Sequence, residues 1–485
     1  MLLRVLKSIN YISVAELRFI NKTMKRFLLI LAAVAAIVPS TVMAQDICGT
    51  WSGELDISGQ KLGLSFNIRK ADNGYAATLD VPQQGARGLA VSGCTFDGLN
   101  MKMDIASIGA SFEGIFVMGM ISGKFFQSGL ELPLVLKKEE LKAPERPQTP
   151  KEPFPYECRE VTFENPKAGV KLAGTLTIPQ REGPFPAVVL VTGSGAQNRD
   201  EEIMGHRPFA VIADFLARNG IAVLRYDDRG VGGSERGPEG PTTVDFSYDA
   251  EAAVNALFEE GRTIVCSGNV CREVNRFSRI GILGHSEGAQ IAFILASRKK
   301  AAFVVSLGGP AVKGSEILRA QQEALYKASG LPQEAIDANA AFFSKVYGAV
   351  EGSKSLEEAE PELRKMAALL PAQQQKQFLA EILNPWMYTF IKLDPEPYIS
   401  ATRCPALILN GDKDLQVVAS QNLPVFENIA SKSRRDFTIR EMKGLNHLFQ
   451  HCNTGLPTEY GQISETIAPE VLEAIVEFIK ATEKK

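Results

Sequence analysis

Between residues 46 and 138, apolar and polar residues alternate over short stretches. Residues 49–57 (GTWSGELDI), 62–68 (LGLSFNI) and 75–81 (YAATLDV) show the alternation clearly, and turn-forming pairs such as Asp97-Gly98 separate the stretches. A period of two is typical of strands that bury one face. The pattern therefore predicts a small all-β, barrel-like domain over residues 45–138, with seven or eight strands.

From residue 157 onward, unbroken apolar runs alternate with stretches of helical periodicity. Such apolar runs indicate strands that are buried on both faces of a parallel sheet. We therefore expect an α/β domain over residues 157–485, with a mostly parallel, doubly wound sheet and helices on both faces. The expected strands are 187–191, 221–225, 280–283, 303–307, 406–409 and 436–440, and the expected helices are 208–219, 248–260 and 469–482.

Two segments interrupt this pattern. Residues 139–156 (EELKAPERPQTPKEPFPY) hold five prolines among many charges, which predicts a stiff, extended linker between the domains. Residues 313–398 show helical spacing and no strand. An insertion between two sheet strands would lie over their carboxyl ends, so we expect a helical cap there. The alternative is a structural insertion that does not contact substrate.

The composition supports a globular protein. Of the 485 residues, 45% are hydrophobic and 22% are charged, which excludes a mainly disordered, collagen-like or multi-span membrane protein. The formal net charge of −3 gives no basic surface for nucleic acid, which is therefore not an expected partner.

The N-terminal segment has the pattern of an export signal. Met24-Lys25-Arg26 precedes an apolar run over residues 27–38, and Val42-Met43-Ala44 then supplies small residues. This order is typical of a secretory signal, and the run is too short to cross a bilayer. We expect translation to start at Met24 and the mature chain to begin near Gln45, in the periplasm or outside the cell. A membrane anchor is the alternative reading, but stable membrane insertion is not expected.

The seven cysteines all follow this signal. Export permits disulfides, and Cys266 and Cys271 flank a Gly-Asn turn that they would close, although two unrelated thiols fit the spacing equally well. No Cys/His cluster has the spacing of a zinc site, so no metal is expected.

The strongest chemical motif follows the expected strand 280–283. Gly284-His285-Ser286-Glu287-Gly288 is a G-x-S-x-G nucleophile elbow, and helical sequence follows it. A serine in this strained turn projects its hydroxyl above the sheet. The sequence therefore predicts Ser286 as a nucleophile that forms an acyl-enzyme.

The partners of such a serine follow it in the order acid, then histidine. The expected strand 406–409 ends in a glycine turn that carries Asp412 and Asp414, and Asp414 lies at the position that reaches inward. After the next strand comes His447, which we assign as the general base; His451 fits a surface residue better. Asp414, or Asp412 as the alternative, would orient the imidazole.

The oxyanion requires two backbone donors. The N–H of Glu287, directly after the nucleophile, is one candidate. The second is expected in the glycine-rich loop after the first buried strand, from Ser194 or alternatively from Gly195.

Together these residues resemble the α/β-hydrolase superfamily. The resemblance covers about residues 157–485 and includes the elbow, the acid turn, the histidine turn and the glycine-rich loop. Residues 192–200 (TGSGAQNRD) and 444–449 (GLNHLF), behind a β domain, look more narrowly like secreted bacterial carboxylesterases of the serine aminopeptidase-like branch. The resemblance implies the α/β-hydrolase fold with a cap, and ester hydrolysis with no metal or organic cofactor. Thr192 stands where the common form of the oxyanion loop has histidine.

Other residues have two interpretations. Arg199-Asp200-Glu201-Glu202 could line the mouth of a site, but we interpret it as a solvated loop. His206 could contact substrate from the same segment. Trp386, Tyr388 and Phe390 could line an acyl pocket under the cap or pack in a core.

Three functions fit these features. The first is a carboxylesterase that acts on small or medium acyl esters with Ser286, Asp414 and His447. The second is a peptidase that uses the same residues, which would need an acidic group for a free amino terminus. The third is a binding protein in which the β domain acts and the hydrolase is a relic.

Overall fold

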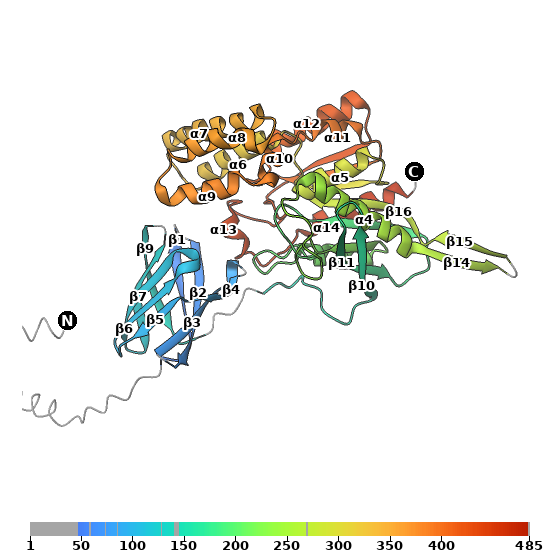
Figure 1. Ribbon diagram of the computed structural model, residues 1–485. Helices are drawn as coiled ribbons and strands as arrows, with labels where there is room; N and C mark the ends of the chain where they lie inside the picture. Colours follow the sequence, from blue (N-terminus) through green and yellow to red (C-terminus); the bar gives the residue numbers. More distant parts are fainter. Residues whose placement is uncertain are drawn as a thin grey trace, which may run out of the picture.

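The computed structural model describes residues 47–57, 60–72, 74–84, 86–127, 129–139, 145–267 and 270–483. The expected export signal and the expected mature start near Gln45 lie outside the described residues. Two large sheets organise the described chain: a nine-stranded sheet comes first, and an eight-stranded sheet follows it (Figure 1).

The nine-stranded sheet is antiparallel, in the order β4-β3-β2-β1-β9-β8-β7-β6-β5. Side chains alternate between its faces, as the sequence pattern requires: in β6, Met101, Met103 and Ile105 are buried whereas Asn100 and Lys102 are exposed. The strands are β1 (Gly49–Ile57), β2 (Gln60–Ala71), β3 (Gly74–Val81), β4 (Ala86–Ala90), β5 (Gly93–Phe96), β6 (Asn100–Ile105), β7 (Ala110–Val117), β8 (Met120–Gln127) and β9 (Leu130–Lys137).

This sheet curls so that its two ends approach each other. Tyr75 of β3 and Phe96 of β5, near opposite ends of the strand order, meet edge-on with ring centroids 6.4 Å apart. The concave face encloses a core around Trp51, whose indole nitrogen donates to the carbonyl oxygen of Ile47 at 2.7 Å. The expected barrel-like domain is thus a curled antiparallel half-barrel.

The eight-stranded sheet has the order β10-β11-β13-β12-β16-β17-β18-β19. Its first two pairings are antiparallel and the others are parallel. The strands are β10 (Tyr156–Asn165), β11 (Val170–Pro179), β12 (Phe185–Val191), β13 (Ala222–Tyr226), β16 (Phe277–His285), β17 (Val304–Leu307), β18 (Ala406–Gly411) and β19 (Phe437–Met442).

Helices cover both faces of this sheet. Every residue of β12 is buried, because Val188 and Leu190 point into one core and Val189 and Val191 into the other. The first core receives α3 (Pro208–Arg218) and α14 (Pro469–Thr482). The second receives α4 (Thr243–Gly261), α5 (Glu287–Ser297) and α12 (Ala419–Ser433). The expected parallel sheet with helices on both faces is confirmed.

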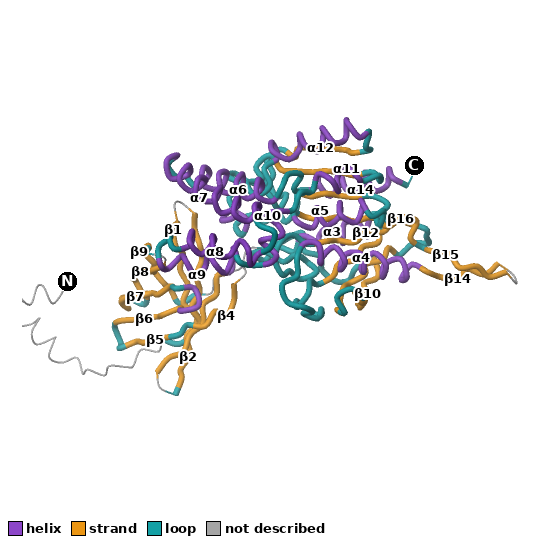
Figure 2. The backbone as a smooth tube through the Cα atoms, turned by 45° about the horizontal axis from the view of Figure 1, so that its top comes forward, coloured by secondary structure: helices purple, strands orange, loops and turns teal. Residues whose placement is uncertain are grey.

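The segment between β17 and β18 is helical, and its first five helices correspond to the expected cap (Figure 2). These are α6 (Gly314–Ala328), α7 (Gln333–Gly352), α8 (Leu356–Ala367), α9 (Ala372–Ile382) and α10 (Pro385–Lys392). Buried side chains from α7, α8 and α9 form a core of their own, around Val346, Leu363 and Phe378. The sixth helix, α11 (Glu396–Ala401), instead packs Ile399 into the main body.

A hairpin that the sequence pattern did not indicate projects from the main body. It consists of β14 (Arg262–Ser267) and β15 (Val270–Asn275), and it extends well beyond the sheet (Figure 1). A disulfide joins Cys266 and Cys271, which face each other across the two strands. The expected disulfide is thus present, and the alternative of two unrelated thiols is excluded for this pair.

The segment that follows the β domain is bound to the main body. The guanidinium of Arg146 donates to the carbonyl oxygens of Met204, Gly461 and Ile463. The last two belong to the region around α13 (Pro457–Tyr460).

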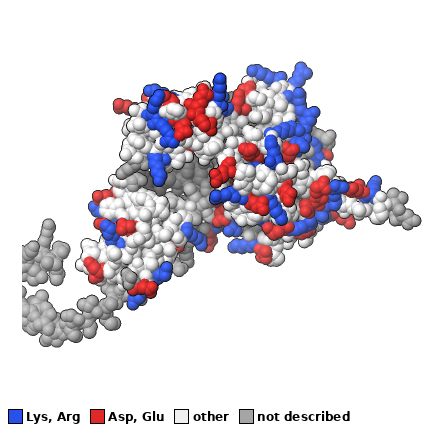
Figure 3. Space-filling model, viewed as in Figure 1, with Lys and Arg blue, Asp and Glu red and all other residues white. Residues whose placement is uncertain are grey.

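Acidic and basic side chains are interspersed on the face shown in Figure 3.

Within the described residues, no helix has the length and apolar character needed to span a membrane. The same part of the chain contains no cluster of histidine, cysteine and acidic side chains that could hold a metal ion.

Candidate active site

Ser286 lies in a tight turn between β16 and α5. Its φ of 53° is in the left-handed region, which is rare for a residue with a side chain. A hydrogen bond from its N–H to Leu307 O, 2.8 Å long, pins the turn to β17. A Cβ at Gly284 would lie 2.1 Å from Gly288 O, and one at Gly288 would lie 2.1 Å from Val191 O. Both flanking glycines are therefore required by close packing.

Asp414 and His447 are bonded to each other beside this turn. His447 Nδ1 lies 2.7 Å from Asp414 Oδ2, and both side chains are almost fully buried. The other carboxylate oxygen accepts the N–H groups of Gln416 and Val417 at 2.8 and 2.9 Å. The carboxylate is thus held in one orientation, with an oxygen aimed at the imidazole.

The two alternative assignments lie elsewhere. Asp412 accepts the N–H of Gly444 at 2.7 Å and lies 3.6 Å from Lys443, so it braces the histidine turn from outside. His451 is about half exposed and contacts Glu465 and Glu470. Neither side chain lines the cavity that contains Ser286.

The two expected oxyanion donors border the same cavity. The N–H of Ser194 and that of Glu287 have no protein acceptor within the described chain, whereas the N–H of Gly193 donates to Glu201 Oε1 at 2.7 Å. Gly195, the alternative donor, lines two neighbouring cavities instead. The geometry therefore leaves Ser194 and Glu287 free to bind an anionic oxygen.

The interpretation of residues 199–202 as a solvated loop is wrong for most of the segment. Arg199 binds Asp227 through two nitrogens at 2.7 and 3.1 Å, and Asp200 pairs with Arg225. Glu201 is only 3% exposed. Charge suggested solvent exposure, but these charges are paired with partners that are distant in sequence.

Glu201 forms a second buried acid–imidazole pair, with His285. Its Oε1 lies 2.9 Å from His285 Nδ1, and His285 Nε2 lies 3.0 Å from the carbonyl oxygen of His447. Burial alone would lower the pKa of His285, but the Glu201 carboxylate raises it above the ordinary value. The pair joins the glycine-rich loop to the histidine turn, and no sequence motif indicated it.

The side chain of Glu287 has a role separate from its N–H. Its Oε1 accepts Thr243 Oγ1 at 2.6 Å and the indole N–H of Trp386 at 2.8 Å. Burial raises the pKa of this carboxyl, against hydrogen bonds from Thr243, Trp386 and Ser194 that lower it. One sequence signal could have indicated this role: Glu287 is an acidic residue at the first position of a helix that is otherwise mostly apolar.

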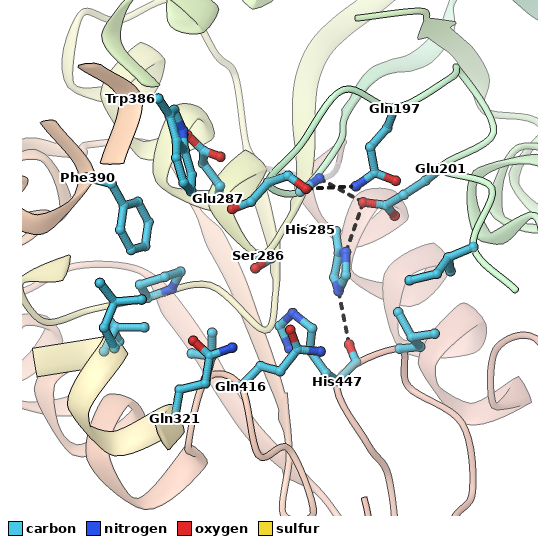
Figure 4. Close-up of a pocket in the computed structure, with 18 residues that line it drawn as sticks. Gln197, Glu201, His285, Ser286, Glu287, Gln321, Trp386, Phe390, Gln416 and His447 are labelled. Carbon is cyan, nitrogen blue, oxygen red and sulfur yellow. Dashed lines mark hydrogen bonds and ion pairs between the residues drawn. The ribbon is translucent and has the colours of Figure 1, made fainter. Parts of the chain in front are cut away.

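The cavity around Ser286 has a volume of about 250 Å³ (Figure 4). Its walls are mostly neutral and include side chains from α6, from α10 and from the histidine turn. The apolar lining residues are Ile203, Pro310, Ile317, Leu318, Trp386, Phe390, Val417 and Leu448. Three amides, Gln197, Gln321 and Gln416, add hydrogen-bonding groups that the sequence did not reveal.

The four remaining candidate residues lie in different places. Trp386 and Phe390 line this cavity, whereas the hydroxyl of Tyr388 lies near Ser353 and Lys392 and faces away. His206 is fully buried, with its ring nitrogens 2.9 Å from Thr466 Oγ1 and 3.0 Å from Tyr460 O. It is a structural residue and does not reach the cavity.

Comparison with known proteins identifies the family. The family model described as serine aminopeptidase, S33, matches residues 206–451, which is half of the chain. The chain belongs to this family of α/β-hydrolases. The match includes the elbow, the acid turn and the histidine turn. Family membership agrees with the resemblance inferred from the motifs.

One curated relative of this S33 chain is an esterase. Esterase EstD of Thermotoga maritima is 27% identical over 325 residues, which cover 66% of this chain and 68% of EstD. Among solved structures, the Pyrococcus furiosus esterase Pf2001 gives a TM-score of 0.42 at 16% identity, over 71% of this chain and 99% of its own. A proline iminopeptidase of Mycobacterium smegmatis gives 0.41 at 16% identity, over 67% and 99%.

Proposed function

We propose that this protein hydrolyses carboxylic esters with short acyl groups through an acyl-enzyme on Ser286. The observation that carries the proposal is the 2.7 Å contact between His447 Nδ1 and the buried Asp414 Oδ2, because His447 lines the same cavity as Ser286. The esterase relative supports the same reaction class.

In the acylation step, His447 Nε2 takes the proton of the Ser286 hydroxyl as the oxygen attacks the ester carbonyl. Asp414 holds the imidazole in the tautomer with its proton on Nδ1 and stabilises the cation that forms. The alcohol then leaves with the proton from His447. Deacylation repeats these steps with water as the nucleophile, and it releases the acid and restores Ser286.

The N–H groups of Ser194 and Glu287 would bind the negative oxygen of each tetrahedral intermediate. The N–H of Glu287 also lies at the N-terminus of α5, where the helix dipole favours negative charge. A fixed donor of this kind contributes about 3 kcal/mol to lowering the barrier.

The cavity lining favours a neutral ester over a peptide with a free amino terminus. An aminopeptidase requires an anionic group for the substrate ammonium. The two carboxylates that line the cavity, Glu201 and Glu287, are both 3% exposed and bonded within the protein. We therefore place ester hydrolysis ahead of peptidase activity. The bonded Asp414 and His447 likewise argue against a relic used only for binding.

The test compares Ser286→Ala with Ser297→Ala at the far end of the same helix. Replacing the nucleophile should reduce turnover of p-nitrophenyl acetate and butyrate by about 10⁴-fold or more, because the acyl-enzyme cannot form. Ser297→Ala should keep near-normal activity. Retained activity in Ser286→Ala, or faster turnover of aminoacyl arylamides than of esters by the unmodified enzyme, would contradict the proposal.

A further inference from the structure

A second, larger cavity lies next to the one that contains Ser286. Its volume is about 600 Å³, and it is bordered by the loop after β13, by α4, and by α9 and α10 of the cap. Trp386 lines both cavities. Much of the remaining lining is apolar, from Pro238, Pro241, Phe246, Ala380 and Pro385.

The charged side chains of the second cavity do not cover this apolar surface, because the inner ones are bound to partners within the protein. Asp228 accepts the hydroxyl of Thr192, and Arg229 forms a buried ion pair with Asp249 at 2.6 Å. Arg236 and Glu239 are exposed on the outer loop and have opposite charges. In the inner part, Arg229 is therefore neutralised by Asp249, and Asp228 is bound by hydrogen bonds from Thr192 and Gln197.

Trp386 is fixed in place as the wall between the two cavities. Its indole N–H donates to Glu287 at 2.8 Å, and its ring stacks on Phe390 with centroids 5.3 Å apart. Its backbone N–H donates to Asn384 Oδ1 at 2.8 Å, which caps the N-terminus of α10. Contacts with the backbone, the ring edge and the ring face all limit its movement.

The position of Trp386 relative to Ser286 indicates which part of an ester it meets. The leaving oxygen must receive its proton from His447, so the alcohol group lies on the His447 side. Figure 4 shows Trp386 and His447 on opposite sides of Ser286. The acyl chain therefore extends toward Trp386 and, beyond it, toward the second cavity.

We propose that Trp386 sets the acyl-chain limit of this enzyme and that the second cavity is a latent binding site for the distal part of a medium-length fatty acyl chain. The inference rests on the proposed esterase function. With Trp386 in place, the chain is confined to about 250 Å³. Removing the indole would join this space to the adjoining cavity of about 600 Å³.

The test measures kcat/KM for p-nitrophenyl esters from acetate to decanoate. In Trp386→Ala, the ratio of octanoate to butyrate activity should rise by about tenfold or more, since each methylene that gains apolar contacts improves binding. Phe390→Ala is the matched control, because Phe390 borders only the first cavity. It should move the preferred chain length far less. Trp386→Phe keeps an aromatic wall and should retain the short-chain preference.

A second substitution tests whether the chain enters the adjoining cavity. Ala380 lies on an exposed position of α9 and borders only the second cavity. Adding Ala380→Trp to Trp386→Ala should fill that space and reverse the gain for octanoate. Trp386→Leu provides the same comparison if the alanine variant does not fold.

Two outcomes would overturn the inference: a chain-length profile that does not change in the folded Trp386 variants, or a gain that Ala380→Trp does not reverse. Either result leaves ester hydrolysis intact as long as Ser286→Ala is inactive. Activity in Ser286→Ala would instead overturn the proposed mechanism itself.

Discussion

The floor and the roof of the cavity are built in different ways. The floor consists of Ser286, Asp414 and His447, which follow the carboxyl ends of β16, β18 and β19 and are held by the sheet and by backbone hydrogen bonds. The roof consists of side chains from α6 and α10, in a cap whose helices share a core of their own. In the proposed mechanism, the sheet therefore positions the reacting groups, whereas helices α6 and α10 shape the space for substrate.

The largest expected effect comes from altering the floor. Asp414→Asn should lower kcat by about 10³–10⁴-fold, because an amide that donates to His447 favours the wrong tautomer and no longer stabilises the imidazolium. Steady-state kinetics with p-nitrophenyl butyrate would measure the loss. Asp412→Asn is the matched control, since Asp412 accepts the N–H of Gly444 and pairs with Lys443 but does not contact His447. Equal losses in the two variants would refute the assignment of the acid.

A substitution in the roof should have a moderate and selective effect. Leu318→Phe places extra bulk in the cavity wall, so kcat/KM for butyrate should fall about tenfold more than kcat/KM for acetate. The same change at Leu331, which is 39% exposed and lies after α6, should leave both values near normal. Equal losses for the two esters in Leu318→Phe would mean that the roof does not select by chain length.

The smallest effect is expected at Asp228, next to the floor, and it concerns the stability of the fold. Asp228 accepts hydrogen bonds from Thr192 Oγ1 and from the N–H of Gln197, both at 2.9 Å. Burial raises the pKa of Asp228 to about 7, against an ordinary value of 3.8. Between these values the folded protein binds a proton that the unfolded chain has lost. The stability that this group contributes is thus present below about pH 4 and is lost as the pH rises through about 7.

Asp228→Asn should therefore gain stability relative to the unmodified protein as the pH increases from 5 to 8. Thermal unfolding followed by circular dichroism at several pH values gives the difference in Tm directly. A difference that stays constant across this range would show that Asp228 does not titrate there.

The floor could be predicted from the sequence because each of its parts follows a local rule. The elbow requires Gly284 and Gly288 at fixed positions around Ser286, and a Cβ at either glycine would clash with backbone. Asp414 follows β18, whose residues are all buried, and His447 follows β19, a partly buried strand that the sequence pattern also predicted.

The roof could not be predicted in the same way. Apolar residues at helical spacing fit a core and a cavity wall equally well, so Phe390 and Tyr388 looked alike in the sequence, yet only Phe390 borders the cavity. The contacts of Glu201 and Glu287 also depend on residues far away in the chain, up to 99 positions for the bond from Trp386 to Glu287. No local pattern carries that information.

The β domain shows an intermediate case. Its strands follow from the alternation of side chains, but its curvature depends on contacts such as the one between Tyr75 and Phe96, which join strands near opposite ends of the sheet. The hairpin β14–β15 was missed because most of its described side chains are exposed and its pattern lacks an apolar face.

The most direct test is to identify the nucleophilic residue by covalent labelling. The purified protein would be treated with a fluorophosphonate probe, digested with trypsin and analysed by mass spectrometry. The account predicts that loss of esterase activity parallels labelling of residues 280–298, with the label on Ser286, and that Ser286→Ala is not labelled. Complete inactivation without a label in this peptide, or with a label on another residue, would contradict it.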